Sequence, residues 1–224
     1  MASYATLGGG VKFPISHRLQ SSPLQHSRAI VRDCCKGDFI WQRYRSTVCS
    51  VASCVPLLIQ QRYHISGFNR SWDEYKRGFG DTRGNFWIGN DMLSWLTANN
   101  YYKLKFDLQS CKNGNWYYAE YSTFVVLPEA RNYKLQVAGY SGNAGYDKFG
   151  VDALTYHSGQ MFSTYDRDND QWSSGNCAEY YDGGFWHNSC YYCGVNQSPA
   201  VEFRWHGLPG GKQLQASRMW LLCK

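Results

Sequence analysis

Hydrophobic and polar residues alternate in three consecutive segments between residues 101 and 140. In YYKLKFDLQ, apolar side chains at positions 102, 104, 106 and 108 alternate with Lys, Asp and Gln, as in a half-buried strand. WYYAEYSTFVV predicts a second strand after a turn at Asn113 and Gly114. RNYKLQVAGY predicts a third, with Tyr133, Leu135 and Val137 on one face. Short connections between the three strands predict an antiparallel meander.

Two short helices are expected before these strands. Ser71 and Glu74 have the spacing of a capping box, which predicts a helix over residues 72–78 that ends at glycine. A second helix fits NDMLSWLT, where Asn90 or Asp91 can serve as the N-cap.

The pattern changes after residue 141. Turn-forming clusters such as SGNAG, HSGQ, SSGN and DGG follow one another with little periodicity, and such a stretch needs additional links to hold a shape. The chain also contains 9 Trp, 18 Tyr, 11 Phe and 22 Gly. This composition favours a loop-rich antiparallel protein over a helical bundle.

The distribution of charge argues against binding to nucleic acid. Residues 1–45 hold seven Lys or Arg against two Asp, a net of +5, whereas residues 46–224 hold sixteen against fifteen, a net of +1. The body of the chain is therefore nearly neutral, which disfavours phosphate-driven binding. We expect residues 1–33 to be a poorly ordered extension.

Nine cysteines indicate an oxidising compartment. No apolar segment typical of a signal peptide is visible near the N-terminus. No run reaches the roughly eighteen apolar residues that a membrane-spanning helix needs, so we expect no membrane span. The odd count leaves at least one thiol unpaired or available to another chain.

An acidic run, YDRDNDQWSSGNC, stands out in the loop-rich region. Asp166, Asp168 and Asp170 alternate with other residues, so their charges call either for screening by water on a loop or for a hard cation among them. The loop is not an EF-hand, because Gln171 replaces the required glycine and Cys177 the required glutamate.

Six motifs of the chain occur in an order that is typical of one family. They are FNRSWDEYKRGFGD at 68–81, NFWIGND at 85–91, YAEYSTF at 118–124, YSGNAG at 140–145, FSTYDRDND at 162–170 and NCAEYY at 176–181. Together they resemble the fibrinogen C-terminal (fibrinogen-related) domain over roughly residues 57 to 193. The family includes ficolins, tachylectins, tenascins and angiopoietins.

The resemblance implies an α+β fold. A central twisted antiparallel sheet with short helices would be followed by a long, loop-rich C-terminal subdomain stabilised by calcium and a disulfide. We therefore expect residues 34–224 to form one fibrinogen-related domain with a shortened first subdomain and an atypical C-terminal end. VPLLIQQRYHISGFN would supply the first strand, and SRMWLLCK replaces the usual last one.

The resemblance also implies a calcium site in the acidic run. The carboxylates of Asp168 and Asp170 and the carbonyls of Trp172 and Ser174 would hold Ca²⁺, a hard cation that prefers oxygen ligands. Asp170 and Cys177 are seven positions apart, one more than is usual in the family. This insertion leaves open whether Ser174 or its neighbour supplies the second carbonyl.

By resemblance, Cys177 and Cys190 form the disulfide that closes the next loop. A rival interpretation is a zinc site that uses Cys190, Cys193 and His187, although a zinc ribbon would need a second CxxC motif, which the sequence lacks. The pairing of the remaining cysteines is left open. They are Cys34, Cys35, Cys49, Cys54, Cys111, Cys193 and Cys223.

In ficolin-like members this loop binds an acetyl group. The resemblance implies that Tyr181 and Tyr191 form aromatic walls and that backbone N–H groups near Cys190 hold the acetyl oxygen beside a cis Ser189–Cys190 peptide. Tyr191 replaces the usual His, and the following wall is shortened to GVNQSPAVEFRW. For Trp186 we expect a place in the core instead.

We expect no enzymatic activity. Asp152, His157 and Ser158 could be combined into a catalytic triad, but no nucleophile elbow accompanies them, and the family it resembles is not enzymatic. The chain is therefore expected to act by binding.

The main functional hypothesis is a secreted, calcium-dependent recognition module with lectin-like binding of acetylated carbohydrates in innate immunity. The alternative is an extracellular-matrix, adhesion or receptor-binding module of the tenascin, angiopoietin or fibrinogen type, in which the same loop meets an extracellular protein. A third hypothesis is a non-functional isoform with altered ends. Homo-oligomers would have to form through surface contacts or a spare cysteine, because the sequence shows no stem.

Overall fold

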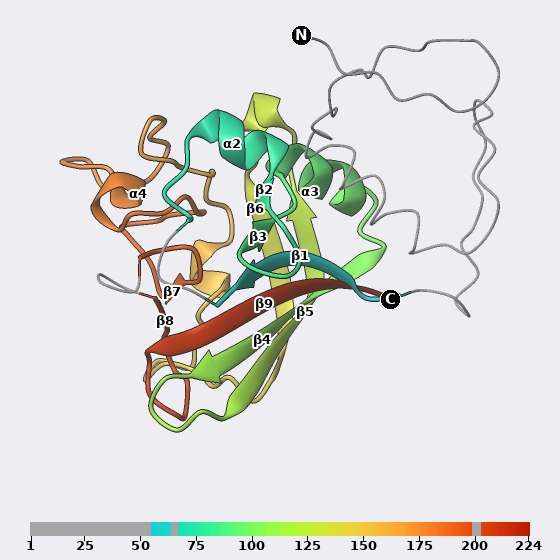
Figure 1. Ribbon diagram of the computed structural model, residues 1–224, viewed down its shortest axis with the longest axis vertical. Helices are drawn as coiled ribbons and strands as arrows, with labels where there is room; N and C mark the ends of the chain where they lie inside the picture. Colours follow the sequence, from blue (N-terminus) through green and yellow to red (C-terminus); the bar gives the residue numbers. More distant parts are fainter. Residues whose placement is uncertain (1–54, 64–66, 199–202) are drawn as a thin grey trace, which may run out of the picture.

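The computed structural model describes residues 55–63, 67–198 and 203–224 (Figure 1). The predicted extension, residues 1–33, and the cysteines Cys34, Cys35, Cys49 and Cys54 lie outside the described residues. Within them, Cys111 and Cys193 are free thiols and Cys223 is disulfide-bonded.

The centre of the fold is one seven-stranded antiparallel sheet in the order β2-β3-β1-β9-β4-β5-β6. The predicted meander is confirmed as three consecutive neighbours at one side of this sheet. The strands are β1 (Leu57–Arg62), β2 (Phe79–Gly80), β3 (Phe86–Trp87), β4 (Tyr102–Ser110), β5 (Trp116–Val126), β6 (Leu135–Gly142) and β9 (Leu214–Cys223).

The last segment of the chain forms a central strand of the sheet. β9 lies between β1 and β4, pairing Leu58 with Trp220 on one side and Phe106 with Met219 on the other. Figure 1 shows β9 running alongside β4. The C-terminal end is thus a full strand that joins the first described strand to the meander.

One of the predicted strands, β5, departs from strict alternation. In β5 the buried residues change from Tyr121 to Phe124, three positions apart. Opposite the change lies Gly139, with φ +74°, where a Cβ atom would come within 2.0 Å of the Ser122 hydroxyl oxygen. Tyr133 precedes β6, but it is buried together with Leu135 and Val137, as predicted.

A buried glutamine connects the sheet to the loop-rich half. Gln60 on β1 is fully buried, and its amide donates to the Val195 carbonyl at 3.2 Å, to Asn196 at 3.1 Å and to the Ser217 hydroxyl at 3.1 Å. A buried polar group needs such partners to offset its loss of water. The sheet and the segment around residue 195 are therefore held in one register.

The two helices cover one end of the sheet (Figure 1). Helix α2 (Trp72–Arg77) has the predicted capping box and ends at Gly78. Helix α3 (Asn90–Thr97) begins after Gly89, which has φ +106° and offers no side-chain cap. The prediction of Asn90 or Asp91 as the N-cap is therefore wrong. Asn90 lies inside the helix, where its buried side chain accepts a hydrogen bond from the Trp87 indole.

Besides the sheet and the helices α2 and α3, the described residues form short regular elements. They are the 3₁₀ helices η2 (Glu129–Arg131) and η3 (Thr155–His157), the helix α4 (Cys177–Tyr180), and the two-stranded ribbon of β7 (Cys193–Gly194) and β8 (Arg204–Trp205). None of the helices in the described part of the chain has the length and apolar character needed to cross a bilayer.

Aromatic side chains fill the space between the sheet, helix α2 and the loops. Phe162 lies 5.1 Å from Tyr75 and 5.3 Å from Trp186, measured between ring centroids, and Trp186 lies 6.2 Å from Trp87. All four are fully buried. Trp186 is thus part of the core, as expected, and its indole N–H donates to the Tyr133 carbonyl at 2.7 Å.

Replacing Ser71 by Ala should lower the free energy of unfolding by about 1 kcal/mol, because the backbone N–H of Glu74 loses its capping partner. Urea denaturation measures the change. The control is Ser141→Ala, at an exposed position of β6 where no side-chain hydrogen bond is found within the described residues. Equal stability of the two variants would contradict the capping role.

Candidate binding site at the acidic loop

Asp170 folds the acidic run back toward helix α4. One carboxylate oxygen accepts the backbone N–H of Trp172 at 2.7 Å, and the other accepts that of Cys177, also at 2.7 Å. A carboxylate that accepts backbone N–H groups forms strong, charge-assisted hydrogen bonds. The side chain of Asp170 thus closes the loop to Cys177, which lies seven positions further along the chain.

Asp168 adds a second negative charge at the same place. Its carboxylate accepts the backbone N–H of Asp170 at 3.1 Å. Burial, and to a lesser extent the charge of Asp168, raise the pKa of the Asp170 carboxyl, although the N–H groups of Trp172 and Cys177 act in the opposite direction. Two carboxylates that disfavour each other's ionisation would be stabilised by a cation between them.

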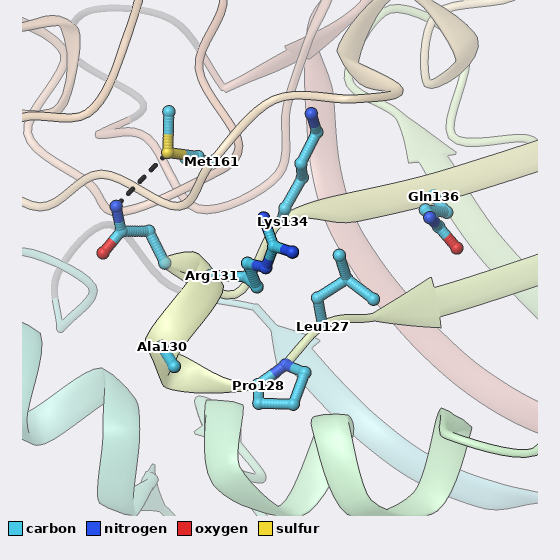
Figure 2. Close-up of a pocket in the computed structure, with 8 residues that line it drawn as sticks. Leu127, Pro128, Ala130, Arg131, Lys134, Gln136 and Met161 are labelled. Carbon is cyan, nitrogen blue, oxygen red and sulfur yellow. Dashed lines mark hydrogen bonds between the residues drawn. The ribbon is translucent and has the colours of Figure 1, made fainter.

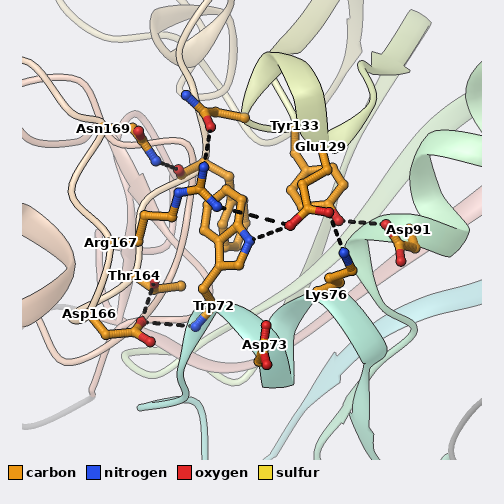
Figure 3. Close-up of polar contacts among 12 residues, drawn as sticks. Trp72, Asp73, Lys76, Asp91, Glu129, Tyr133, Thr164, Asp166, Arg167 and Asn169 are labelled. Carbon is orange, nitrogen blue, oxygen red and sulfur yellow. Dashed lines mark hydrogen bonds and ion pairs between the residues drawn. The ribbon is translucent and has the colours of Figure 1, made fainter.

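The other two charged residues of the run face away from this pair. Asp166 accepts the backbone N–H of Trp72 at 2.9 Å, so it serves the first turn of helix α2. Arg167 places its guanidinium 4.0 Å from the centre of the Trp72 ring (Figure 3). It also donates to Asn132 at 3.0 Å. Arg167 therefore anchors the loop to η2 and α2.

Asn176 and Trp172 fix the rest of the loop. The Asn176 side-chain oxygen caps helix α4 by accepting the N–H groups of Ala178 and Glu179, and its amide donates to the carbonyls of Thr164 and Tyr165. Such a cap stabilises a helix start by about 1 kcal/mol. A Cβ atom at Gly175 would lie 2.8 Å from the Trp172 indole, so a larger residue there would require the ring to shift.

The donor atoms expected for Ca²⁺ lie in this short stretch. The Trp172 carbonyl accepts only the Gly175 N–H at 3.2 Å, and no hydrogen bond to the Ser174 carbonyl is found within the described residues. Nowhere in ranges 55–63, 67–198 and 203–224 do three or more His, Cys, Asp or Glu side chains gather in a way that could hold a metal. A cation here would depend on two carboxylates and backbone carbonyls, which suits the oxygen preference of Ca²⁺.

The Cys177–Cys190 disulfide is confirmed, with a Cα–Cα distance of 5.6 Å. Because Cys190 is bonded to Cys177, the zinc interpretation is wrong. His187 is fully buried, and its Nε2 atom contacts the Gly183 carbonyl at 3.0 Å. The Ser189–Cys190 peptide bond is cis, as the resemblance implied.

A row of aromatic rings connects the acidic loop to the segment after the disulfide. The centroid of Trp172 lies 5.6 Å from that of Tyr180, Tyr180 lies 4.8 Å from Tyr181, and Tyr181 lies 4.7 Å from Tyr191, all edge to face. We call these four residues the aromatic ridge. The structure thus brings the predicted Tyr181 and Tyr191 together and adds Tyr180, which is 61% exposed and which sequence reasoning missed.

His157 holds the backbone after the disulfide. Its Nδ1 atom is 2.8 Å from the Trp186 carbonyl, and its Nε2 atom accepts the backbone N–H groups of Tyr192 and Cys193. This pattern requires a neutral imidazole with the proton on Nδ1. The sequence did not predict this structural role of His157, because its partners lie 29 to 36 positions away.

The triad considered from the sequence is not assembled. Besides the contacts of His157, the Ser158 hydroxyl bonds to the backbone of Val137, and Asp152 accepts the Tyr121 hydroxyl at 2.6 Å. Each side chain serves a structural bond elsewhere. No nucleophile and base lie within reach of each other among these three.

Acid should destabilise the protein through His157. Burial lowers the pKa of His157 to about 3, so the folded state keeps a neutral ring while the unfolded chain binds a proton below its ordinary pKa of about 6.5. This contribution is complete above pH 6.5 and is lost as the pH falls toward 3. The loss should be about 1.4 kcal/mol for each pH unit below 6.5.

Urea unfolding at pH 7.5 and at pH 5.5 tests this role. His157→Gln should be less stable than the native protein at pH 7.5, but its stability should fall by about 1.4 kcal/mol less between the two pH values. An equal fall in both proteins would show that His157 is not the buried neutral group.

Comparison with known protein families supports the resemblance. A family model described as the C-terminal globular domain of fibrinogen beta and gamma chains matches residues 50–206. Human angiopoietin-related protein 2 is 42% identical over 134 residues, which cover 59% of this chain and 26% of that protein. The chain thus spans about a quarter of the length of this relative. Mouse tenascin, at 43% identity over 148 residues, and the human fibrinogen alpha chain, at 46% over 156 residues, also match, and these relatives are secreted, extracellular proteins.

Solved structures confirm the fold. The fibrinogen-like globe domain of human ANGPTL2 superposes with a TM-score of 0.67 at 33% identity, covering 78% of this chain and 82% of that one. A lamprey fibrin D-dimer complexed with the peptide Gly-His-Arg-Pro-amide has a TM-score of 0.65 at 30% identity, covering 75% and 61%. The expected α+β architecture is therefore correct.

Proposed function

Because the chain belongs to the fibrinogen C-terminal globular domain family and is an extracellular recognition module, we propose that it binds a protein or peptide partner through the aromatic ridge. Ca²⁺ held by Asp168 and Asp170 would keep the ridge in place. The observation that carries this proposal is the unbroken ring contact from Trp172 in the acidic loop to Tyr191 beyond the disulfide.

The ridge has the chemistry of a protein-binding surface. Tyr and Trp are enriched at interaction hot spots because they present large apolar areas with a polar end. Glu179 is exposed beside the ridge, and Asp182 follows Tyr181 directly. Two carboxylates at the edge favour a partner with basic groups. The lamprey fibrin structure, whose peptide contains His and Arg, provides a similar example in another protein.

Calcium would supply one thing at this site, which is charge neutralisation of Asp168 and Asp170. The chain's own groups do the rest. Asp170 joins Trp172 to Cys177, Asn176 starts helix α4, and this helix carries Tyr180 toward Tyr181. A fixed loop therefore also fixes the positions of Trp172 and Tyr180, the first two residues of the aromatic ridge.

Acetylated carbohydrate is the second candidate. The contact between Tyr181 and Tyr191, the two residues that the resemblance places in an acetyl pocket, favours it. Two features weigh against it: Tyr191 replaces the usual His, and the segment between residues 194 and 205 is shortened. The altered wall leaves the peptide proposal ahead.

Calcium should raise the melting temperature of the native protein but not that of Asp168→Asn/Asp170→Asn. At one hundred times the dissociation constant, Ca²⁺ would contribute about 2.7 kcal/mol. Differential scanning calorimetry with calcium and with chelator measures the effect. The matched control is Asp166→Asn, which weakens the contact with Trp72 and should lower stability while leaving the calcium response intact. Loss of the response in this control would contradict the assignment.

Tyr181→Ala should reduce calcium-dependent retention on immobilised Gly-His-Arg-Pro-amide by at least about tenfold, since truncating a hot-spot aromatic costs 2 kcal/mol or more. Tyr165→Ala, an exposed tyrosine outside the ridge, is the control. A parallel column carries N-acetylglucosamine. Retention there, with elution by free acetate and none on the peptide column, would favour the carbohydrate candidate over the peptide proposal.

A further inference from the structure

A separate groove lies where the end of β5 passes through η2 into β6 (Figure 2). Its volume is about 730 Å³, within the range of roughly 300 to 1,000 Å³ that is usual for ligand sites. Leu127, Pro128, Ala130 and Met161 give it an apolar wall. None of the groove-lining residues belongs to the aromatic ridge.

The groove has an unbalanced positive charge. Arg131 and Lys134 are both exposed, and neither side chain has an ion pair or a hydrogen bond within the described residues. No Asp or Glu lines the groove. The nearest carboxylate along the chain, Glu129, is already paired with Lys76 and accepts the Trp72 indole N–H at 2.9 Å (Figure 3). Two cations are therefore available to an anionic ligand.

The backbone beneath these cations is held in an unusual shape. Asn132 has φ 49° and ψ 40°, and Tyr133 also has φ 49°. A left-handed conformation at a bulky residue is uncommon and persists only when its surroundings impose it. Here Arg167 donates to Asn132, the Tyr133 hydroxyl donates to Asp91, and the Trp186 indole donates to the Tyr133 carbonyl. Hydrogen bonds at both Asn132 and Tyr133 thus hold the turn in this conformation.

The apolar wall is fixed as well. The Asn132 amide donates to the Met161 sulfur at 3.2 Å, which sets Met161 against the turn (Figure 2). A thioether beside a proline and a leucine offers an adaptable apolar contact. The groove therefore combines an apolar surface with two unpaired cations on a rigid turn.

We propose that this groove is a second binding site, and that it takes an acidic peptide segment of a partner protein. Two carboxylates of the peptide pair with Arg131 and Lys134, and an apolar side chain between them packs on Leu127, Pro128 and Met161. A sulfated polysaccharide would use the cations but leave the apolar wall without a partner. The peptide uses both features.

Fluorescence anisotropy with an amidated, fluorescein-labelled peptide of sequence Asp-Leu-Asp-Phe-Glu tests the proposal. The native protein should bind it, and binding should weaken as the salt concentration rises. Arg131→Glu/Lys134→Glu should weaken binding at least about tenfold. Met161→Gln should weaken it without altering the dependence on salt.

The matched controls separate charge from folding. Lys112→Glu and Arg83→Glu make the same charge changes at exposed positions outside the groove, so together they should leave binding unchanged. Melting curves confirm that each variant is folded.

Equal binding by the double groove variant and the double control would overturn the proposal. It would also be overturned if a sulfated heparin fragment bound the groove while the peptide did not. Adding chelator should leave peptide binding in the groove unchanged, because Arg131 and Lys134 are not calcium ligands. The groove proposal and the acidic-loop proposal can therefore fail independently.

Discussion

The Asp170 carboxylate is the contact on which the loop-rich half of the molecule depends. Its two oxygens hold the backbone of Trp172 and of Cys177 at the same distance, 2.7 Å, and thereby set the start of helix α4 and the position of the disulfide. Few regular elements exist in this half to do the same work. Side-chain-to-backbone hydrogen bonds replace the strand ladder of the sheet.

The loop is joined to the sheet by a small number of polar side chains. Arg167 reaches η2, His157 binds the backbone after the cis peptide, and Gln60 joins β1 to the segment near residue 195. The Gln60 and His157 links are buried or partly buried and satisfied, which makes a polar group specific for one arrangement, whereas the Arg167 link lies at the surface. The acidic loop, the aromatic ridge and the groove at η2 therefore lie on one connected framework. Arg167 takes part in it from within the acidic run itself.

The sequence was sufficient for the features that depend on local patterns or on shared motifs. Alternation predicted β4, and the spacing of Ser71 and Glu74 predicted the start of α2. The sequence was not sufficient where the role of a residue depends on a partner that is distant in the sequence or on backbone geometry. The N-cap of α3 is Gly89 and neither Asn90 nor Asp91. Tyr180 belongs to the aromatic ridge because its ring contacts Trp172 and Tyr181. Such contacts arise from tertiary packing, which single-sequence patterns do not encode.

The most direct test is a crystal structure of the oxidised protein grown with calcium. We predict an ion between Asp168 and Asp170, about 2.3 to 2.6 Å from their oxygens and from the Trp172 carbonyl, with Ser174 or an adjacent residue as the next carbonyl ligand. The anomalous signal of calcium would identify the ion. Carboxylates bound only by water, in protein that also shows no heat on titration with Ca²⁺, would contradict the account.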